Sequence, residues 1–148
     1  MPSYVRCILQ CRKRAVQHIR RISAVIMLVC LVLPQRACVY SQRTVEYYPL
    51  SDVEGLWAIV VLACYVLPLA ALILLRHRPI ADAVTGIVIA LFGLWQQGLG
   101  ALQSSSYVFA GWYLYVVSTT LFLITSLVQL RGTIVRRRMH QLNSEGSL

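Results

Sequence analysis

The chain has 148 residues, of which 58% are hydrophobic and 13% are charged, and its formal net charge at pH 7 is +9. Such a composition is too apolar for an ordinary soluble domain, and the length allows a single domain. The positive charge would suit a nucleic-acid-binding protein, but twelve of the fourteen Lys and Arg residues flank long apolar stretches. Membrane topology alone requires basic residues there, so nucleic acid is not an expected partner.

The basic residues fall in three short segments, which precede the first apolar stretch, separate the second from the third, and follow the fourth. The positive-inside rule demands this alternation of a chain that crosses a membrane four times with both ends in the cytoplasm. The sequence therefore predicts an all-α integral membrane protein, a four-transmembrane-helix antiparallel bundle with cytoplasmic termini in a bacterial-type inner membrane. Its first partner would be the lipid bilayer, whose anionic inner leaflet attracts basic residues. The residues expected at that membrane surface are Arg12, Lys13, Arg14, Arg20, Arg21, Arg76, Arg78, Arg136, Arg137 and Arg138.

Residues 1–21 form a basic N-terminal segment with the pattern of an amphipathic helix. Its apolar residues recur at spacings of three and four, which places them on one helical face. Two interpretations stay open: a helix that lies in the cytoplasmic interface, or a disordered basic tail that only orients the first span. The apolar face consists of Tyr4, Ile8, Cys11, Ala15, Ile19 and Ile22.

The first predicted span, about residues 22–40, is uninterrupted and apolar only over residues 24–33. Because a basic segment precedes this core and Pro34 follows it, a cleaved signal peptide competes with a retained helix. Residues 35–37 do not provide the small-residue site that cleavage requires. We therefore expect the first span to be retained as a helix.

The remaining apolar stretches predict three further spans of roughly bilayer length. Pro68 lies inside the second span and is expected to kink it, because proline removes a backbone donor. The short basic connection between the second and third spans makes these two an antiparallel hairpin. The expected organisation is a transmembrane domain over residues 22–130, with spans at about 22–40, 56–75, 80–99 and 107–130, followed by a tail over 131–148 that is basic and then flexible.

Small and amide side chains repeat every seven residues in the third and fourth spans. Seven-residue spacing places each set along one face of its helix. Lipid provides no hydrophobic drive for helix association, so close backbone approach and interhelical hydrogen bonds must provide it. These faces predict a helix-packing seam, which closes the monomer's own bundle, forms a homo-oligomer, or receives a helix of another protein. The predicted seam consists of Gly86, Ala90, Gly93, Gln97, Gly111, Ser118, Thr125 and Gln129.

Asp82 is the only acidic residue inside a predicted span, and it lies three residues after Pro79. We expect it to favour the helix start, at the positive end of the helix dipole, and to face Arg76 or Arg78. The predicted bundle therefore contains no buried charge. No nucleophile–base pair, glycine-rich phosphate loop or acidic metal cluster is present in the sequence, so no catalytic residue, metal or cofactor is predicted.

The sequence favours a non-enzymatic membrane protein that acts through helix–helix contacts, as an accessory subunit, an assembly factor or an immunity-type protein. Its partner would be another membrane protein or a second copy of the chain. A small transporter or pore for a neutral solute is the alternative, and a holin-like protein is the second. A transport path would be lined by Gln96, Gln97, Gln103, Ser118, Thr119, Thr120, Thr125 and Gln129.

Overall fold

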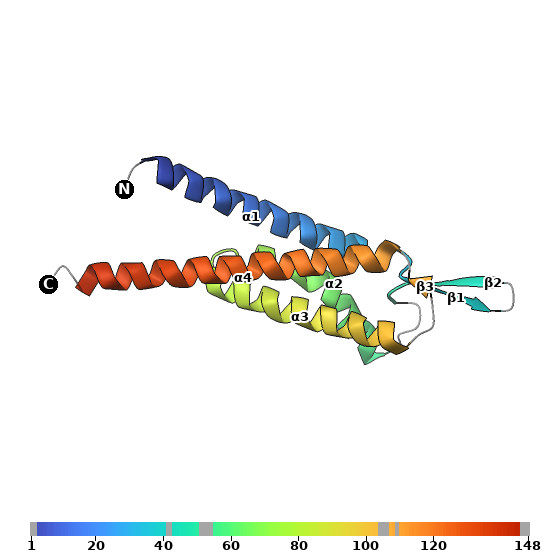
Figure 1. Cartoon of the computed structure of the whole chain (residues 1–148). Coiled ribbons are helices and arrows are strands. Elements are labelled where there is room, and N and C mark those ends of the chain that lie inside the picture. The colour runs from blue at the N-terminus through green and yellow to red at the C-terminus, as the bar shows by residue number, and fades with distance from the viewer. Residues whose placement is uncertain (1–2, 41–42, 51–54, 104–106, 109, 146–148) are drawn as a thin grey trace.

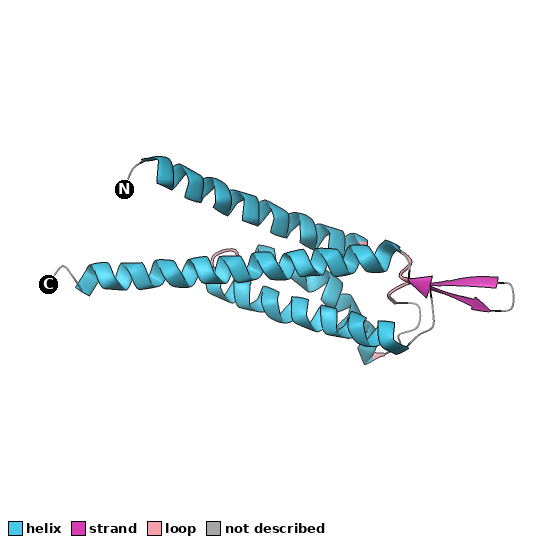
Figure 2. Ribbon diagram, in the orientation of Figure 1, coloured by secondary structure: helices cyan, strands magenta, loops and turns pink. Residues whose placement is uncertain are grey.

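A computed structural model describes residues 3–40, 43–50, 55–103, 107–108 and 110–145 of the chain. Four helices and a small three-stranded sheet make up this part of the protein (Figure 2). The elements in chain order are α1 (Ser3–Val29), β1 (Arg36–Tyr40), β2 (Arg43–Tyr47), α2 (Leu56–Leu74), α3 (Pro79–Gln103), β3 (Tyr107–Val108) and α4 (Ala110–Glu145).

The four helices form an antiparallel bundle in which α4 lies between α1 and α3, and α2 packs against α1 and α3 (Figure 1). The two ends of the chain lie at one end of the bundle, together with the short connection between α2 and α3. The sheet lies at the opposite end, and the β1–β2 hairpin projects beyond the helices. We refer to these as the basic end and the sheet end of the bundle.

Three of the helices are long and apolar enough to cross a membrane: α2, residues 79–98 of α3, and residues 110–136 of α4. The 19 residues of α2 correspond to about 28 Å at 1.5 Å per residue, which matches the hydrocarbon thickness of a bilayer. Large apolar side chains are exposed along the outside of the bundle, as expected for surfaces that face lipid. The prediction of a helical protein is thus confirmed, and three of its helices are long and apolar enough to span a membrane.

The first helix differs from the prediction both in where it begins and in where it ends. The structure places the basic segment and the start of the first span in one continuous helix, so residues 1–21 are not a separate element. The helix ends at Val29, where tighter hydrogen bonds follow, such as that from the Val32 N–H to the Val29 carbonyl at 3.1 Å. Pro34 disfavours helical backbone in the residue before it, which explains why the helix does not continue to residue 40.

Residues 36–40, which the sequence assigned to the first span, form strand β1. β1 pairs in antiparallel register with β2, with Cys38 opposite Val45, and with β3, with Arg36 opposite Val108. The strand order is β2-β1-β3. Both hairpin strands are rich in β-branched and aromatic residues, which suit extended backbone. The 22–40 span is therefore wrong beyond Val29, and the sheet was not predicted. The bounds of 107–130 for the fourth span are also wrong, because residues 107–108 form β3 and α4 continues from Ala110 through most of the predicted tail to Glu145.

The core lies where side chains from all four helices meet. Its largest members are Tyr65 of α2, and Tyr115 and Phe122 of α4. The rings of Tyr65 and Tyr115 pack with their centroids 4.5 Å apart. α1 contributes Ala24 and Met27, both of which are fully buried. The apolar face predicted for the N-terminal segment is not part of this core, because its described members Cys11, Ala15, Ile19 and Ile22 are exposed.

Candidate functional site: two buried polar clusters and an apolar groove

A buried ion pair joins α1 to α3 near the basic end of the bundle. Arg20 of α1 donates from Nη1 to Asp82 Oδ2 at 2.6 Å and from Nη2 to Asp82 Oδ1 at 2.9 Å. Nη2 also donates to the Asp82 carbonyl at 3.0 Å. Arg20 is 1% exposed and Asp82 is 6% exposed. This bidentate geometry is the strong form of a carboxylate–guanidinium contact.

Gln129 of α4 completes this group of side chains, which we call the basic-end cluster (Arg20, Asp82 and Gln129). Its Oε1 accepts from Arg20 Nη1 at 2.8 Å, and its Nε2 donates to Asp82 Oδ2 at 3.0 Å. The cluster therefore connects α1, α3 and α4. Four of the five guanidinium N–H groups have acceptors, while Arg20 Nε is buried without a partner.

The space for the Arg20 side chain is provided by a glycine and a ring on the neighbouring helices. A Cβ atom placed on Gly86 of α3 would lie 2.6 Å from Arg20 Nη2, so a larger residue there would displace the guanidinium from its position. The Phe122 ring of α4 lies 4.9 Å from the Arg20 guanidinium carbon, which is a cation–π contact. On α1, Arg20 shares its helical face with the buried residues Ala24 and Met27.

The basic-end cluster corrects two predictions from the sequence. Arg20 was expected at the membrane surface, but its side chain is buried in the bundle. Asp82 was expected to face Arg76 or Arg78, but both of these arginines are exposed and Asp82 binds Arg20 instead. The bundle therefore does contain a buried charge. The physical reason is that a carboxylate one turn inside α3 neutralises a guanidinium which would otherwise be buried without compensation.

The other predicted surface residues lie in three elements at the basic end. Their described members are exposed, and the side chains of Arg12, Lys13 and Arg137 lie outside the described part. The exposed residues are Arg14 and Arg21 in α1, Arg76 and Arg78 between α2 and α3, and Arg136 and Arg138 in α4.

A second group of polar side chains lies toward the sheet end, and we call it the sheet-end cluster (Gln35, Tyr65 and Gln97). Gln35 Nε2 donates to Tyr65 Oη at 2.7 Å. Gln97 Nε2 lies 3.2 Å from Tyr65 Oη and 3.1 Å from Gln35 Oε1. The cluster connects the turn after α1 to α2 and α3. Beside it, Cys64 Sγ donates to Gln96 Oε1 at 3.4 Å.

The sequence missed this cluster except for Gln97. Tyr65 lies in the middle of an apolar run, and Gln35 follows Pro34 in what was expected to be the end of a span. The sequence contains one weak indication of this cluster, because a tyrosine buried in lipid or protein needs a hydrogen-bond partner for its hydroxyl. Gln35 and Tyr65 lie thirty residues apart in the chain, so no local sequence pattern connects them.

On α3, the predicted seam glycines lie against α1 and α4 of the same chain, whereas Gln97 belongs to the sheet-end cluster. A Cβ atom on Gly93 would lie 2.6 Å from Tyr115 Oη, and Ala90 is fully buried in the core. Gly86 meets Arg20 and Ser126. The small residues of α3 therefore admit large side chains of this chain's own helices.

On α4, the predicted seam residues are divided between two neighbours. A Cβ atom on Gly111 would lie 2.5 Å from the Pro34 carbonyl oxygen, so Gly111 faces the turn after α1 rather than α3. Ser118 and Thr125 are buried, and their hydroxyls donate to backbone carbonyls one turn earlier on α4. Such bonds satisfy a hydroxyl inside a membrane helix without a partner on another helix. Gln129 belongs to the basic-end cluster described above.

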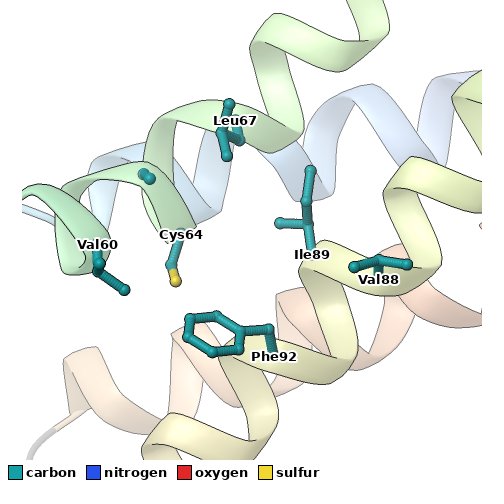
Figure 3. Close-up of a pocket in the computed structure, with 7 residues that line it drawn as sticks. Val60, Cys64, Leu67, Val88, Ile89 and Phe92 are labelled. Carbon is teal, nitrogen blue, oxygen red and sulfur yellow. The ribbon is translucent and has the colours of Figure 1, made fainter.

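A groove lined by apolar side chains and one thiol lies on the outside of the bundle between α2 and α3 (Figure 3). Its volume is about 240 Å³. The Phe92 ring of α3 lies across the groove from α2, and Cys64 points toward it. The lining residues are Val60, Ala63, Cys64 and Leu67 of α2, and Val88, Ile89 and Phe92 of α3.

Free thiols are present at three described positions, namely Cys11, Cys30 and Cys64. Within the residues whose side chains are described, no group of three or more His, Cys, Asp or Glu residues lies close enough together to hold a metal ion. Comparison of the chain with protein-family models, with curated proteins and with solved structures found no match.

Proposed function

We propose that this chain is a small multi-pass inner-membrane protein which performs no chemistry and acts by binding a transmembrane helix of another protein. Such a protein would serve as an accessory subunit, an assembly factor or an immunity-type protein. The observation that supports this function is the groove between α2 and α3, which is lined by apolar side chains and the Cys64 thiol. The two polar clusters of the bundle are engaged within the chain and leave no free reactive pair.

The proposed topology has four spans, with α1 as the first and both termini in the cytoplasm. The α2–α3 connection, which carries the exposed Arg76 and Arg78, lies at the end of the bundle that carries both termini, and the exposed Arg136 and Arg138 belong to the C-terminal part of α4 at the same end. The positive-inside rule assigns such an end to the cytoplasm. The sheet then lies on the outer side, together with the exposed aromatic residues Trp57 and Trp95, which suit the headgroup level.

The groove suits a helix because of what membrane helices require for association. Van der Waals packing, rather than the hydrophobic effect, holds helices together in lipid. A concave surface that receives a side chain therefore makes more van der Waals contacts with a partner helix than a flat surface does. Ala63 lies in the groove and keeps it open on the α2 side. The predicted seam cannot serve this purpose, because Gly86 and Gly93 already face side chains of this chain.

Photo-cross-linking from the groove tests this function. A photoreactive phenylalanine analogue introduced at Val88, which is 60% exposed in the groove, should form a discrete adduct with one membrane protein in intact cells. Val117 of α4 is 57% exposed and lies outside the groove, so it provides a matched control. The adduct should be absent from Val117 and should disappear when Ala63→Leu fills the groove. Equal adducts at both positions, or lipid adducts alone, would reject the function.

A small transporter is the second candidate, and the buried ion pair favours it. Ionisable residues inside membrane segments often mark a transport path, and Arg20 and Asp82 are such residues. Reconstituted protein should then carry a neutral solute across liposomes, and Gln97→Leu should abolish the flux by disrupting the sheet-end cluster. Equal fluxes with and without the protein would exclude this function.

A further inference from the structure

Among the four described helices, α1 is the one that lacks a stretch long and apolar enough to cross a membrane. Its exposed basic residues Arg14 and Arg21 flank Arg20, and its apolar part ends at Val29. From Arg20 to the end of α1 at Val29 the helix covers about 14 Å at 1.5 Å per residue, which is about half of the hydrocarbon thickness. Arg20 must therefore enter the hydrocarbon region if α1 is a span.

The structure provides the means to hold Arg20 there. Its guanidinium binds both carboxylate oxygens of Asp82, and Gln129 bonds both members of the pair. The Arg20 guanidinium lies in a space that is open because Gly86 has no side chain. The adjacent Arg21 lies at nearly the same depth, but its side chain is exposed on the outside of the bundle, where its length lets the guanidinium extend toward the headgroups of the basic end. Two neighbouring arginines of equal charge are thus placed in different surroundings by the rotation of about 100° between successive residues of a helix.

We propose that Asp82 of α3 is the determinant that allows α1 to be retained as a membrane span. Arg20 precedes Asp82 by 62 residues, so during synthesis α1 has no counter-charge until α3 follows. α1 then docks stably only once the Arg20–Asp82–Gln129 cluster forms, and the β1–β2 hairpin is held on the outer side as a result. This proposal rests on the four-span topology given above.

Replacement of Arg20 and replacement of Arg21 should have different effects once Asp82 is lost. Asp82→Leu leaves Arg20 as an uncompensated charge in the hydrocarbon region, so α1 should fail to insert. Arg20→Met in the Asp82→Leu background removes that charge and should restore insertion. Arg21→Met in the same background removes an equal charge from an exposed position and should restore nothing. The two double variants therefore differ only in which of two adjacent arginines is replaced.

The substitution Glu46→Cys reports the location of the hairpin in the whole chain. Glu46 is exposed in β2, and its replacement by cysteine, with the five native cysteines changed to alanine, gives one reactive thiol. A membrane-impermeant maleimide is applied to spheroplasts with an intact inner membrane, and labelling is normalised to the total amount of protein. Failure of the parent protein to label from outside would contradict the four-span topology itself.

In a parent that does label, Asp82→Leu should lower outside labelling about tenfold, as expected when a charged residue opposes insertion of a short span. Arg20→Met/Asp82→Leu should return labelling to within about twofold of the parent, whereas Arg21→Met/Asp82→Leu should not. If Asp82→Leu does not accumulate, the same comparison is made on the accumulated amounts of the two double variants. Unchanged labelling of Asp82→Leu, rescue by both double variants, rescue by neither, or rescue by Arg21→Met alone would overturn the proposal.

Discussion

Arg20 and Arg21 stand side by side in the sequence, yet one is buried and the other is exposed. Charge and hydropathy patterns treat them alike, because both precede the same apolar stretch. Their difference comes from partners on α3 and α4 that lie far along the chain. Loss of one member of a buried pair costs about 3–5 kcal/mol, because the other is left uncompensated. The residue scale is where prediction from the sequence is weakest in this protein.

Tyr65 allows a direct test of the sheet-end cluster at this scale. Its hydroxyl accepts from Gln35 and lies within bonding distance of Gln97, and its ring is buried. Tyr65→Phe keeps the ring but leaves the amide groups short of a partner, so it should lower the free energy of unfolding by about 1–3 kcal/mol. Thermal unfolding of the purified protein in mild detergent measures this change.

The matched control for this change is Tyr113→Phe on α4. Tyr113 is exposed, so loss of its hydroxyl should alter the free energy of unfolding by no more than about 0.5 kcal/mol. Equal effects of the two substitutions would mean that the sheet-end cluster contributes nothing to stability.

At the scale of the elements, the seven-residue spacing in the third and fourth spans placed small residues on faces, but it did not identify what lies opposite each face. Gly93 faces Tyr115 of α4, whereas Gly111 faces the turn after α1. The spacing of residues along the sequence determines which of them share a face, because helix geometry fixes the angle between successive side chains. The identity of the neighbour depends on how four helices pack, which the period does not contain.

Two glycines of α3 give opposite expectations for the same substitution. A Cβ atom on Gly93 would lie 2.6 Å from the hydroxyl of the buried Tyr115, so Gly93→Ala should destabilise the protein by about 1–3 kcal/mol. Gly98 has nothing within 4 Å of such an atom, and Gly98→Ala should stabilise the helix by up to about 1 kcal/mol. Chemical unfolding in detergent gives both values, and a shared sign would contradict the α3–α4 packing.

The segment after α1 forms a strand where the sequence predicted a helix. The apolar stretch of residues 24–33 predicted a helix, and α1 indeed runs through most of it. Residues 36–40 are apolar enough to extend such a span, yet they pair with β2 and β3. Hydropathy cannot distinguish a helix from a strand over five residues, and the strand partners lie elsewhere in the chain.

At the scale of the whole molecule, the number of spans is the property to measure. Four spans place both termini in the cytoplasm, whereas three spans over α2, α3 and α4 place them on opposite sides. Green fluorescent protein fused to either terminus should therefore fluoresce, because it folds in the cytoplasm. Alkaline phosphatase, which is active only outside, should be inactive at both positions. Phosphatase activity at the N-terminus alone would show that α1 does not cross.

The sequence by itself determined that the protein is helical, that it contains helices of membrane-spanning length, and that its basic residues are segregated from them. These properties are local, because they follow from composition and from the period of side chains along one helix. Tertiary structure alone decided that Arg20 pairs with Asp82, that Gln35 reaches Tyr65, and that residues 36–40 form a strand. Each of these depends on a partner distant in the chain, and only packing of the helices brings such partners within hydrogen-bond distance.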